Sequence, residues 1–303
     1  MSLRDALNDE NVVRRYGIRN TEYALRNTAH FRSRAFQRPQ SARDLLRTPL
    51  PQLPLINFHN DTRIAVMTAP DRLEQYRCRY AALKPGWEHA TARYQRWVAE
   101  RITPEAHVLD LGCGRGGITE RLHGAGRWVG VDPDRASVKE HRVRTLTRAQ
   151  ARSERLPFAE GVFDLVVSSW VLEHLPDPCL TFAEIARILR PGGRFLFLTP
   201  NARHPIPRAS RWFARMVGAQ RQVVSSIYGR AEEDTFPVHY GANTPEQIDR
   251  IATQAGLRLV QMELVEDPSY LAWNAPTFGL AVCLEMLLPA MWKVHLIGEY
   301  ARP

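Results

Sequence analysis

Cysteine is scarce in this 303-residue chain, and its spacing limits the kinds of site that the sequence supports. The four cysteines, at positions 78, 113, 179 and 283, lie far apart and form no Cys-x-x-Cys pair. A disulfide framework and a cysteine zinc site are therefore poorly supported, and a reducing, cytoplasmic compartment is expected. Cys113 lies within a glycine-rich segment, where a small side chain is needed more than a reactive thiol.

Lysine is also scarce, because only three of the 41 basic residues are lysine and the rest are arginine. The formal net charge of +9 is compatible with nucleic-acid binding. However, the arginines are spread along the chain without dense clusters, and genome composition alone can produce such a skew. We therefore do not expect nucleic acid to be the partner.

Long hydrophobic runs are missing as well. The longest apolar stretch, 279–292, is interrupted by Glu285 and Pro289 and is shorter than the ~20 residues of a membrane span. The N-terminal residues Met-Ser-Leu-Arg-Asp lack the apolar core of a signal peptide. We expect a soluble protein without a membrane span.

The most informative segment that is present covers residues 107–132. An apolar run that contains Asp110 leads into Gly-Cys-Gly-Arg-Gly-Gly, and a second apolar run ends at Asp132. This order predicts a strand, a glycine turn, a helix and a second strand. The carboxylate of Asp132 then lies about 20 residues after the first glycine, where it can bind a ribose. The segment predicts a site for a nucleoside cofactor.

The glycines explain how a cofactor can approach the backbone. Gly112 and Gly114 permit a sharp turn and leave room for a ligand that a Cβ atom would exclude. Gly116 and Gly117 let the following helix pack tightly against the strand. The spacing also fits a dinucleotide-binding turn, but such a match alone is weak. Asp110 would repel a pyrophosphate, whereas it suits a cofactor with a cationic amino acid tail.

Two later motifs distinguish these cofactors. The first reads Phe163-Asp-Leu-Val-Val-Ser-Ser-Trp-Val-Leu-Glu-His-Leu-Pro-Asp, and the second reads Leu189-Arg-Pro-Gly-Gly-Arg-Phe-Leu-Phe-Leu-Thr-Pro-Asn. With these motifs in order, the chain resembles the class I S-adenosylmethionine-dependent methyltransferases. The resemblance runs from about Val108 to Asn201, and more loosely from Tyr80 to the C-terminus.

The alternation of strand and helix patterns, together with this resemblance, implies an α/β fold. We expect a Rossmann-like, mostly parallel seven-stranded sheet with helices on both faces and an antiparallel last strand beside the sixth. Thr244-Pro-Glu-Gln predicts a helix start, and that helix should end at Gly256. The expected strands lie near 107–111, 127–131, 145–149, 163–168, 193–199, 257–265 and 292–300. Other expected helices lie near 116–124, 134–141, 179–190 and 277–288.

The chain divides into an N-terminal extension and a methyltransferase domain. Residues 1–70 hold eleven arginines, five prolines and little apolar periodicity, so we expect a basic, partly ordered extension. The alternative is an arm that covers the active site or mediates a homodimer. Residues 71–303 form the expected domain, with a helical cap at 71–101 and lid insertions at 201–241 and 266–290.

The resemblance implies which residues bind S-adenosylmethionine. The backbone of Gly112, Cys113 and Gly114 should hold the methionyl part, with Asp110 beside it and Gly116 completing the turn. The carboxylate of Asp132 should accept both ribose hydroxyls. The remaining expected contacts are Pro133, Ser153 and Glu154 at the adenine and Ser169 and Trp170 at the methionyl chain.

One departure from the family pattern affects the adenine contact. Arg152 stands where relatives often have an aspartate that accepts the adenine amino group. The side-chain contact is therefore in doubt, although the backbone amide of Ser153 could still serve.

Methyl transfer from a sulfonium mainly requires the nucleophile and the methyl group to be close and collinear, so a catalytic side chain is optional. His174, which follows Glu173, is the first candidate for a general base, and a purely structural histidine is the alternative. His239 is a second candidate. Candidate contacts to the acceptor are Tyr80, Trp87, His204 and Tyr240, of which the two aromatic residues of the cap could equally be packing residues.

Two sequence features narrow the chemistry. Some quinone methyltransferases of similar sequence bind a metal beside this histidine, but Trp170 replaces one of their acids, so no metal is expected. The motif Asn/Asp-Pro-Pro-Tyr, typical of enzymes that methylate base nitrogens or glutamine amides, is absent. We predict an S-adenosylmethionine-dependent methyltransferase acting on a small organic acceptor, oxygen first. The alternatives are an RNA or protein methyltransferase, or a non-catalytic cofactor-binding module.

Overall fold

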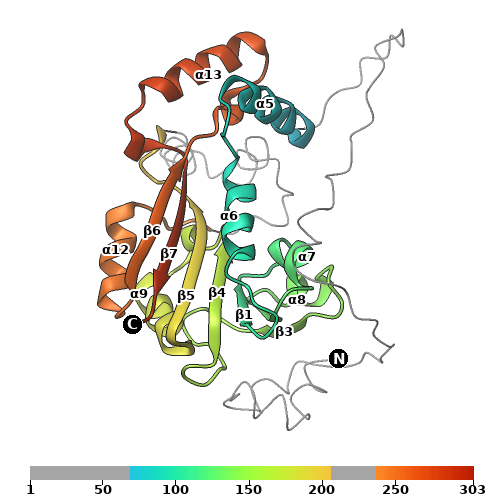
Figure 1. Cartoon of the computed structure of the whole chain (residues 1–303), viewed down its shortest axis with the longest axis vertical. Coiled ribbons are helices and arrows are strands. Elements are labelled where there is room, and N and C mark those ends of the chain that lie inside the picture. Colours follow the sequence, from blue (N-terminus) through green and yellow to red (C-terminus); the bar gives the residue numbers. More distant parts are fainter. Residues whose placement is uncertain (1–68, 206–236) are drawn as a thin grey trace.

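The computed structural model describes residues 69–205 and 237–303 of the chain (Figure 1). Most of the predicted N-terminal extension lies outside these residues. So does the centre of the insertion predicted at 201–241.

A seven-stranded sheet forms the centre of the molecule, in the order β3-β2-β1-β4-β5-β7-β6. The first five strands pair in parallel, and β7 runs antiparallel to both of its neighbours. This arrangement confirms the predicted fold, including the insertion of the last strand beside the sixth. The strands are β1 (His107–Leu111), β2 (Arg127–Asp132), β3 (Thr147–Gln150), β4 (Phe163–Ser169), β5 (Leu189–Pro200), β6 (Arg258–Val265) and β7 (His295–Ala301).

Helices cover both faces of the sheet, as predicted (Figure 1). On one face lie α9 (Pro178–Ile188) and α12 (Pro245–Gln254), which contact each other. On the other face, α6 (Ala90–Ala99) packs against β5 and β7. The remaining described α-helices are α5 (Ala69–Leu83), α7 (Ile118–Leu122), α8 (Arg135–Glu140) and α13 (Ala275–Leu287).

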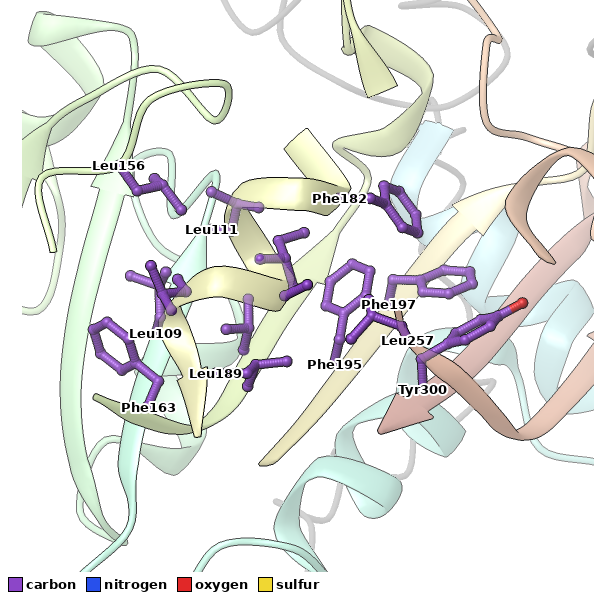
Figure 2. Packing of buried hydrophobic residues seen from close by; sticks show 14 of the residues in the cluster. Leu109, Leu111, Leu156, Phe163, Phe182, Leu189, Phe195, Phe197, Leu257 and Tyr300 are labelled. Atoms are coloured by element: carbon purple, nitrogen blue, oxygen red, sulfur yellow. The ribbon is translucent and has the colours of Figure 1, made fainter. Parts of the chain in front are cut away.

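Alternating side chains of the buried strands supply two hydrophobic cores. Leu109, Phe195 and Phe197 pack with residues of α9 and α12 in the larger core, part of which Figure 2 shows. Their chain neighbours Val108 and Leu196 point to the other face, where they join α6. Both faces of a parallel sheet are covered, which explains why these strands read as nearly continuous apolar runs in the sequence.

Capping side chains define where several helices begin. Thr244 accepts a hydrogen bond from the Gln247 amide at 3.3 Å, so the predicted start of α12 is confirmed. Asp177 and Asn274 cap α9 and α13 in the same way. Gly256, with a φ of +81°, lies two residues after the end of α12, in the backbone conformation that glycine adopts most easily.

Two predicted boundaries are wrong by three residues or more. The closing strand expected from 292 begins at His295, because residues 290–292 form the 3-10 helix η4 (Ala290–Trp292). The helix expected to reach residue 190 ends at Ile188, and β5 begins at Leu189 rather than near 193. Leu189 pairs with Phe163, and its carbonyl accepts a hydrogen bond from the Arg302 guanidinium at 2.6 Å. Pairing with a distant part of the chain therefore overrides the local helical pattern.

The segment predicted as a helical cap contains two helices with different surroundings. They are separated near Pro85-Gly86-Trp87. Whereas α6 packs on the sheet, α5 contacts the 3-10 helix η3 (Pro268–Leu271), which belongs to the second insertion. The rings of Tyr76 and Phe278 lie 4.9 Å apart and join α5 to α13. None of the described helices is long and apolar enough to cross a membrane.

Gly298 offers a test of how tightly β7 fits within the sheet. A Cβ atom on Gly298 would lie 2.3 Å from the Phe197 ring, which is fully buried. We expect Gly298→Ala to lower the free energy of unfolding by about 1–3 kcal/mol, because the core would be overpacked. Gly279→Ala is the matched control, since a Cβ there has no neighbour within 4 Å. Equal denaturant midpoints for the two variants would contradict this account of the packing.

Candidate functional site

A cavity of about 1030 Å³ opens at the carboxyl ends of β1, β2 and β4. In a parallel sheet these ends meet at one edge, which is the usual place for a ligand. Many residues that the sequence singles out line this cavity: Gly112, Gly114, Gly116, Asp132, Pro133, Ser153, Glu154, Ser169, Trp170, His174 and His239.

Two residues expected at the cofactor lie behind the cavity wall. The Cys113 side chain is 1% exposed, and its sulfur packs against Gly130. A Cβ atom added to Gly130 would lie only 2.9 Å from the Cys113 sulfur. Cys113 can therefore offer a ligand only its backbone. Asp110 is 3% exposed and is not among the residues that line the cavity.

The four residues expected to contact the acceptor do not line this cavity. The Tyr80 and Trp87 rings pack edge to face at 4.9 Å, and both side chains hydrogen-bond to Glu266. His204 lies 3.2 Å from the buried Glu285 carboxylate. Tyr240 is buried beside Glu173, whose carbonyl accepts from its amide at 3.2 Å. Each of the four therefore occupies a packed, hydrogen-bonded position.

The glycine turn is fixed by the end of β2. The amides of Gly112 and Cys113 both donate to the Val131 carbonyl, at 2.8 and 3.0 Å. Gly112 has a φ of +77°, and a Cβ atom there would lie 2.3 Å from the Val171 side chain. A Cβ on Gly114 would instead meet open space, although the φ of +53° is still unfavourable for other residues. The turn thus requires glycine and leaves room beside its backbone.

Asp132 connects this turn to the rest of the site. One carboxylate oxygen accepts a hydrogen bond from the Gly114 amide at 2.9 Å, and the other accepts from the Asp134 amide at 2.8 Å. Each carboxylate oxygen has a second lone pair with which it can accept a ligand hydroxyl. Burial raises the pKa of Asp132, while the two amide donors act in the opposite direction.

Asp110 makes no ion pair with a cationic side chain among the described residues. Burial raises its pKa to about 7, and the nearby Asp132 carboxylate adds to the rise. At neutral pH the Asp110 carboxyl group is therefore about half protonated, and a nearby cationic ligand would favour its ionised form.

Trp170 adopts an unusual backbone conformation at the end of β4. Its φ of 60° is rare for a residue other than glycine, and its amide donates to the Leu198 carbonyl at 2.8 Å. The ring meets the buried His295 ring edge to face at 5.2 Å. Such conformations are concentrated at functional sites, and this one turns the chain at the wall of the cavity.

The 3-10 helix η1 (Leu172–His174) lies just after Trp170. It contacts residues 237–240, near the C-terminal end of the first insertion. The Glu173 carbonyl accepts from the His239 amide at 2.7 Å, and His174 Nδ1 lies 2.9 Å from the Pro237 carbonyl oxygen. The Glu173 carboxylate is buried and accepts from the Thr199 hydroxyl at 3.1 Å. These contacts bring His174 and His239 to one edge of the cavity.

The sequence interpretation missed part of the cavity lining. Thr91, Tyr94 and Gln95 of α6 line it, as do Arg115 and Arg142. No motif marks the α6 residues, because only the packing of α6 on the sheet brings them to the site. The arginines pair with nearby acids, Arg115 with Glu140 and Arg142 with Glu120, and their charges are thereby partly offset. Within the described residues, no three metal-binding side chains of His, Cys, Asp or Glu are grouped together.

Comparison with known proteins agrees with this geometry. Residues 109–197, which include the glycine turn, Asp132 and η1, match the family model described as a methyltransferase domain. The fold is also similar to that of a Haloferax volcanii methyltransferase solved in a complex with the Trm112 methyltransferase activator. That likeness has a TM-score of 0.50 at 19% identity and covers 78% of this chain and 98% of the other.

Curated relatives carry the similarity beyond the central motifs. The chain is 31% identical over 176 residues to a ubiquinone biosynthesis O-methyltransferase of Thiobacillus denitrificans, covering 55% of this chain and 71% of the relative. It is 26% identical over 199 residues to a demethylmenaquinone methyltransferase of Symbiobacterium thermophilum, covering 55% of this chain and 76% of that protein. The enzyme's cofactor is thus S-adenosylmethionine, and the chain belongs to the class I S-adenosylmethionine-dependent methyltransferases.

Proposed function

We propose that this methyltransferase acts on a hydroxyl oxygen of a small organic acceptor, with His174 as the general base. The observation that carries the proposal is the position of the His174 ring, which lies at the cavity and is oriented by the Pro237 carbonyl. The acceptor would enter beside this ring and meet the cofactor along the wall formed by Ser169 and Trp170.

The tautomer of His174 follows from its partner. A carbonyl oxygen can only accept, so Nδ1 donates to Pro237, and in the neutral ring Nε2 then carries the lone pair. Nε2 lies 3.8 Å from the Glu173 carboxylate, whose negative charge would stabilise the imidazolium formed when the ring takes the acceptor's proton. His239, at the same edge of the cavity, is the second candidate for this base.

The residues present fit the cofactor. S-adenosylmethionine supplies a methyl group on a sulfonium, which is already an excellent leaving group. We place the ribose hydroxyls on Asp132 and the methionyl part along the backbone of Gly112, Cys113 and Gly114, where the open space beside Gly114 admits a ligand. The charge of Asp110 would complement the cationic tail. We place the adenine near Pro133, Ser153 and Glu154.

Three observations support a small acceptor with apolar surface. The cavity volume lies at the upper end of the roughly 300–1,000 Å³ typical of ligand sites, which leaves space beside a cofactor. Trp170, Val171 and Leu175 contribute apolar surface to its wall. The curated relatives named above are a demethylmenaquinone methyltransferase and a ubiquinone biosynthesis O-methyltransferase.

Asp132→Ala tests the ribose contact. Two charge-assisted hydrogen bonds of about 1.5–3 kcal/mol each would be lost, so S-adenosylmethionine should bind more than roughly 100-fold more weakly in calorimetry. Asp132 also accepts two backbone amides, so some loss of thermal stability should accompany the change. Asp134→Ala is the control, because Asp134 caps α8 and does not line the cavity. Unchanged affinity in folded Asp132→Ala would place the ribose elsewhere.

Asp110→Asn tests the buried carboxyl group through the pH dependence of stability. The native state keeps the proton up to about pH 7, whereas an unfolded chain releases it near pH 3.9, so wild-type stability falls as pH rises through this window. Asparagine has no such proton. The variant should therefore gain a few kcal/mol relative to the wild type between pH 4.5 and pH 8, measured by denaturant unfolding without cofactor. A difference that stays constant with pH would contradict the buried, proton-binding carboxyl.

His174→Ala tests the base. Turnover should fall by roughly 10²–10⁴ while cofactor affinity stays nearly intact, and the loss should shrink at high pH with a phenolic acceptor that ionises unaided. The assay uses S-adenosylmethionine with a ¹³C-labelled methyl group, so that the product's NMR shift distinguishes an O-methyl from a C-methyl. His239→Ala, measured in parallel, shows whether the neighbouring histidine is the base instead. Full turnover in stable His174→Ala would remove this residue from the mechanism.

A further inference from the structure

Exposed large apolar side chains are concentrated in one part of the described chain. Eight of the eleven lie on α5, η3, α13 and the segments that connect α13 to its neighbours. The other three, Leu180, Leu259 and Val260, lie on α9 and β6. The eight are Leu83, Leu271, Trp273, Leu280, Leu284, Met286, Leu287 and Met291.

The helix α13 is apolar on both of its faces. Phe278 and Ala281 face inward and are buried, whereas Leu280, Leu284 and Leu287 are 63%, 43% and 81% exposed. A helix on the surface of a globular protein normally turns charged and polar residues to the solvent. Leu280, Cys283, Leu284, Met286, Leu287 and Met291 together are called the outer α13 face below.

This face carries no exposed charge. Between positions 274 and 292 the only charged residue is Glu285, which is 4% exposed. Its carboxylate lies 3.2 Å from His204 Nε2 and 3.3 Å from the Lys293 ammonium. The single acid of this stretch is therefore turned inward and compensated.

Basic side chains lie beside the same helix. The guanidinium of Arg72 lies 4.1 Å from the centre of the Trp273 ring, and that of Arg79 lies 5.3 Å from the centre of the Phe278 ring. Neither makes an ion pair with a carboxylate among the described residues. Between positions 71 and 84 the chain has four basic and two acidic residues. Arg77 and Lys84 pair with Asp267 and Glu266, which leaves Arg72 and Arg79 as the cations beside α13. The overall net charge of the chain is +9. An apolar face bordered by cations is complementary to a lipid layer, whose interior is apolar and whose head groups can be anionic.

The position of α13 relates this face to the cofactor cavity. Because β6 runs parallel to β5, the segment that contains α13 leaves the sheet at the carboxyl ends of the parallel strands (Figure 1). The cavity opens at the carboxyl ends of the same set of strands. At about 1.5 Å per residue, α13 is about 20 Å long, too short to cross a bilayer but long enough to lie along its surface.

We propose that the outer α13 face binds a lipid surface with anionic head groups, lying in the plane of the membrane with Arg72 and Arg79 at the head groups. The protein would thus work at a membrane surface without spanning it. This inference concerns a surface outside the cofactor cavity and does not depend on the identity of the acceptor.

The test uses the full-length protein and lipid vesicles in a flotation assay. The wild type should float with vesicles of phosphatidylcholine and phosphatidylglycerol, and more weakly with phosphatidylcholine alone. Leu284→Glu/Leu287→Glu should reduce the floated fraction about tenfold or more, because two exposed leucines are replaced by charges of the wrong sign. Leu259→Glu is the matched control, since Leu259 is 43% exposed on β6. All variants should keep the wild-type affinity for S-adenosylmethionine.

Cys283 provides an independent readout, because it lies on the outer α13 face and is exposed. Alkylation of Cys283, followed by mass spectrometry, should slow when anionic vesicles are added, while the exposed Cys179 on α9 should react at an unchanged rate. Failure of the wild type to float, or equal flotation of the double variant, would overturn the proposal. So would slow alkylation of Cys283 without vesicles, since another part of this chain or a second copy would then cover the face.

Discussion

The carboxylate of Asp132 is the interaction on which the site depends. It ends β2 and accepts amide hydrogen bonds from the glycine turn after β1 and from the start of the segment leading into α8. Two loops from neighbouring strands are therefore held by one side chain that also faces the cavity. The arrangement requires a carboxylate, because both oxygens must accept at once and still have lone pairs for a ligand.

The strands and the glycine turn could be predicted from the sequence because their requirements are visible in the residue types themselves. Buried parallel strands must be apolar on both sides, and the φ of +77° at Gly112 favours glycine. The start of β5 could not be predicted in this way, since Leu189 becomes a strand residue through pairing with Phe163.

It was harder to predict from the sequence which side chains the fold brings to the cavity. Tyr80 and Trp87 have the aromatic character of an acceptor pocket, yet they pack against each other and against Glu266. Conversely, Thr91 and Gln95 belong to no motif but reach the cavity because α6 crosses the sheet beside it. Sequence periodicity identifies which face of a helix is buried, but it does not identify what that face is buried against.

The position of β7 between β5 and β6 has a consequence for how the molecule folds. β6 pairs with β7 within the described sheet, yet β7 follows it in the chain by about thirty residues. During synthesis β6 emerges before β7, its neighbour in the sheet. The backbone groups of β6 therefore stay unpaired until β7 has been made and has paired with β5. Such non-local pairing slows folding, and it makes the sheet sensitive to any truncation that removes residues 295–301. A shortened chain would lose not one strand but two, together with the support of α12 and of the segment that carries α13.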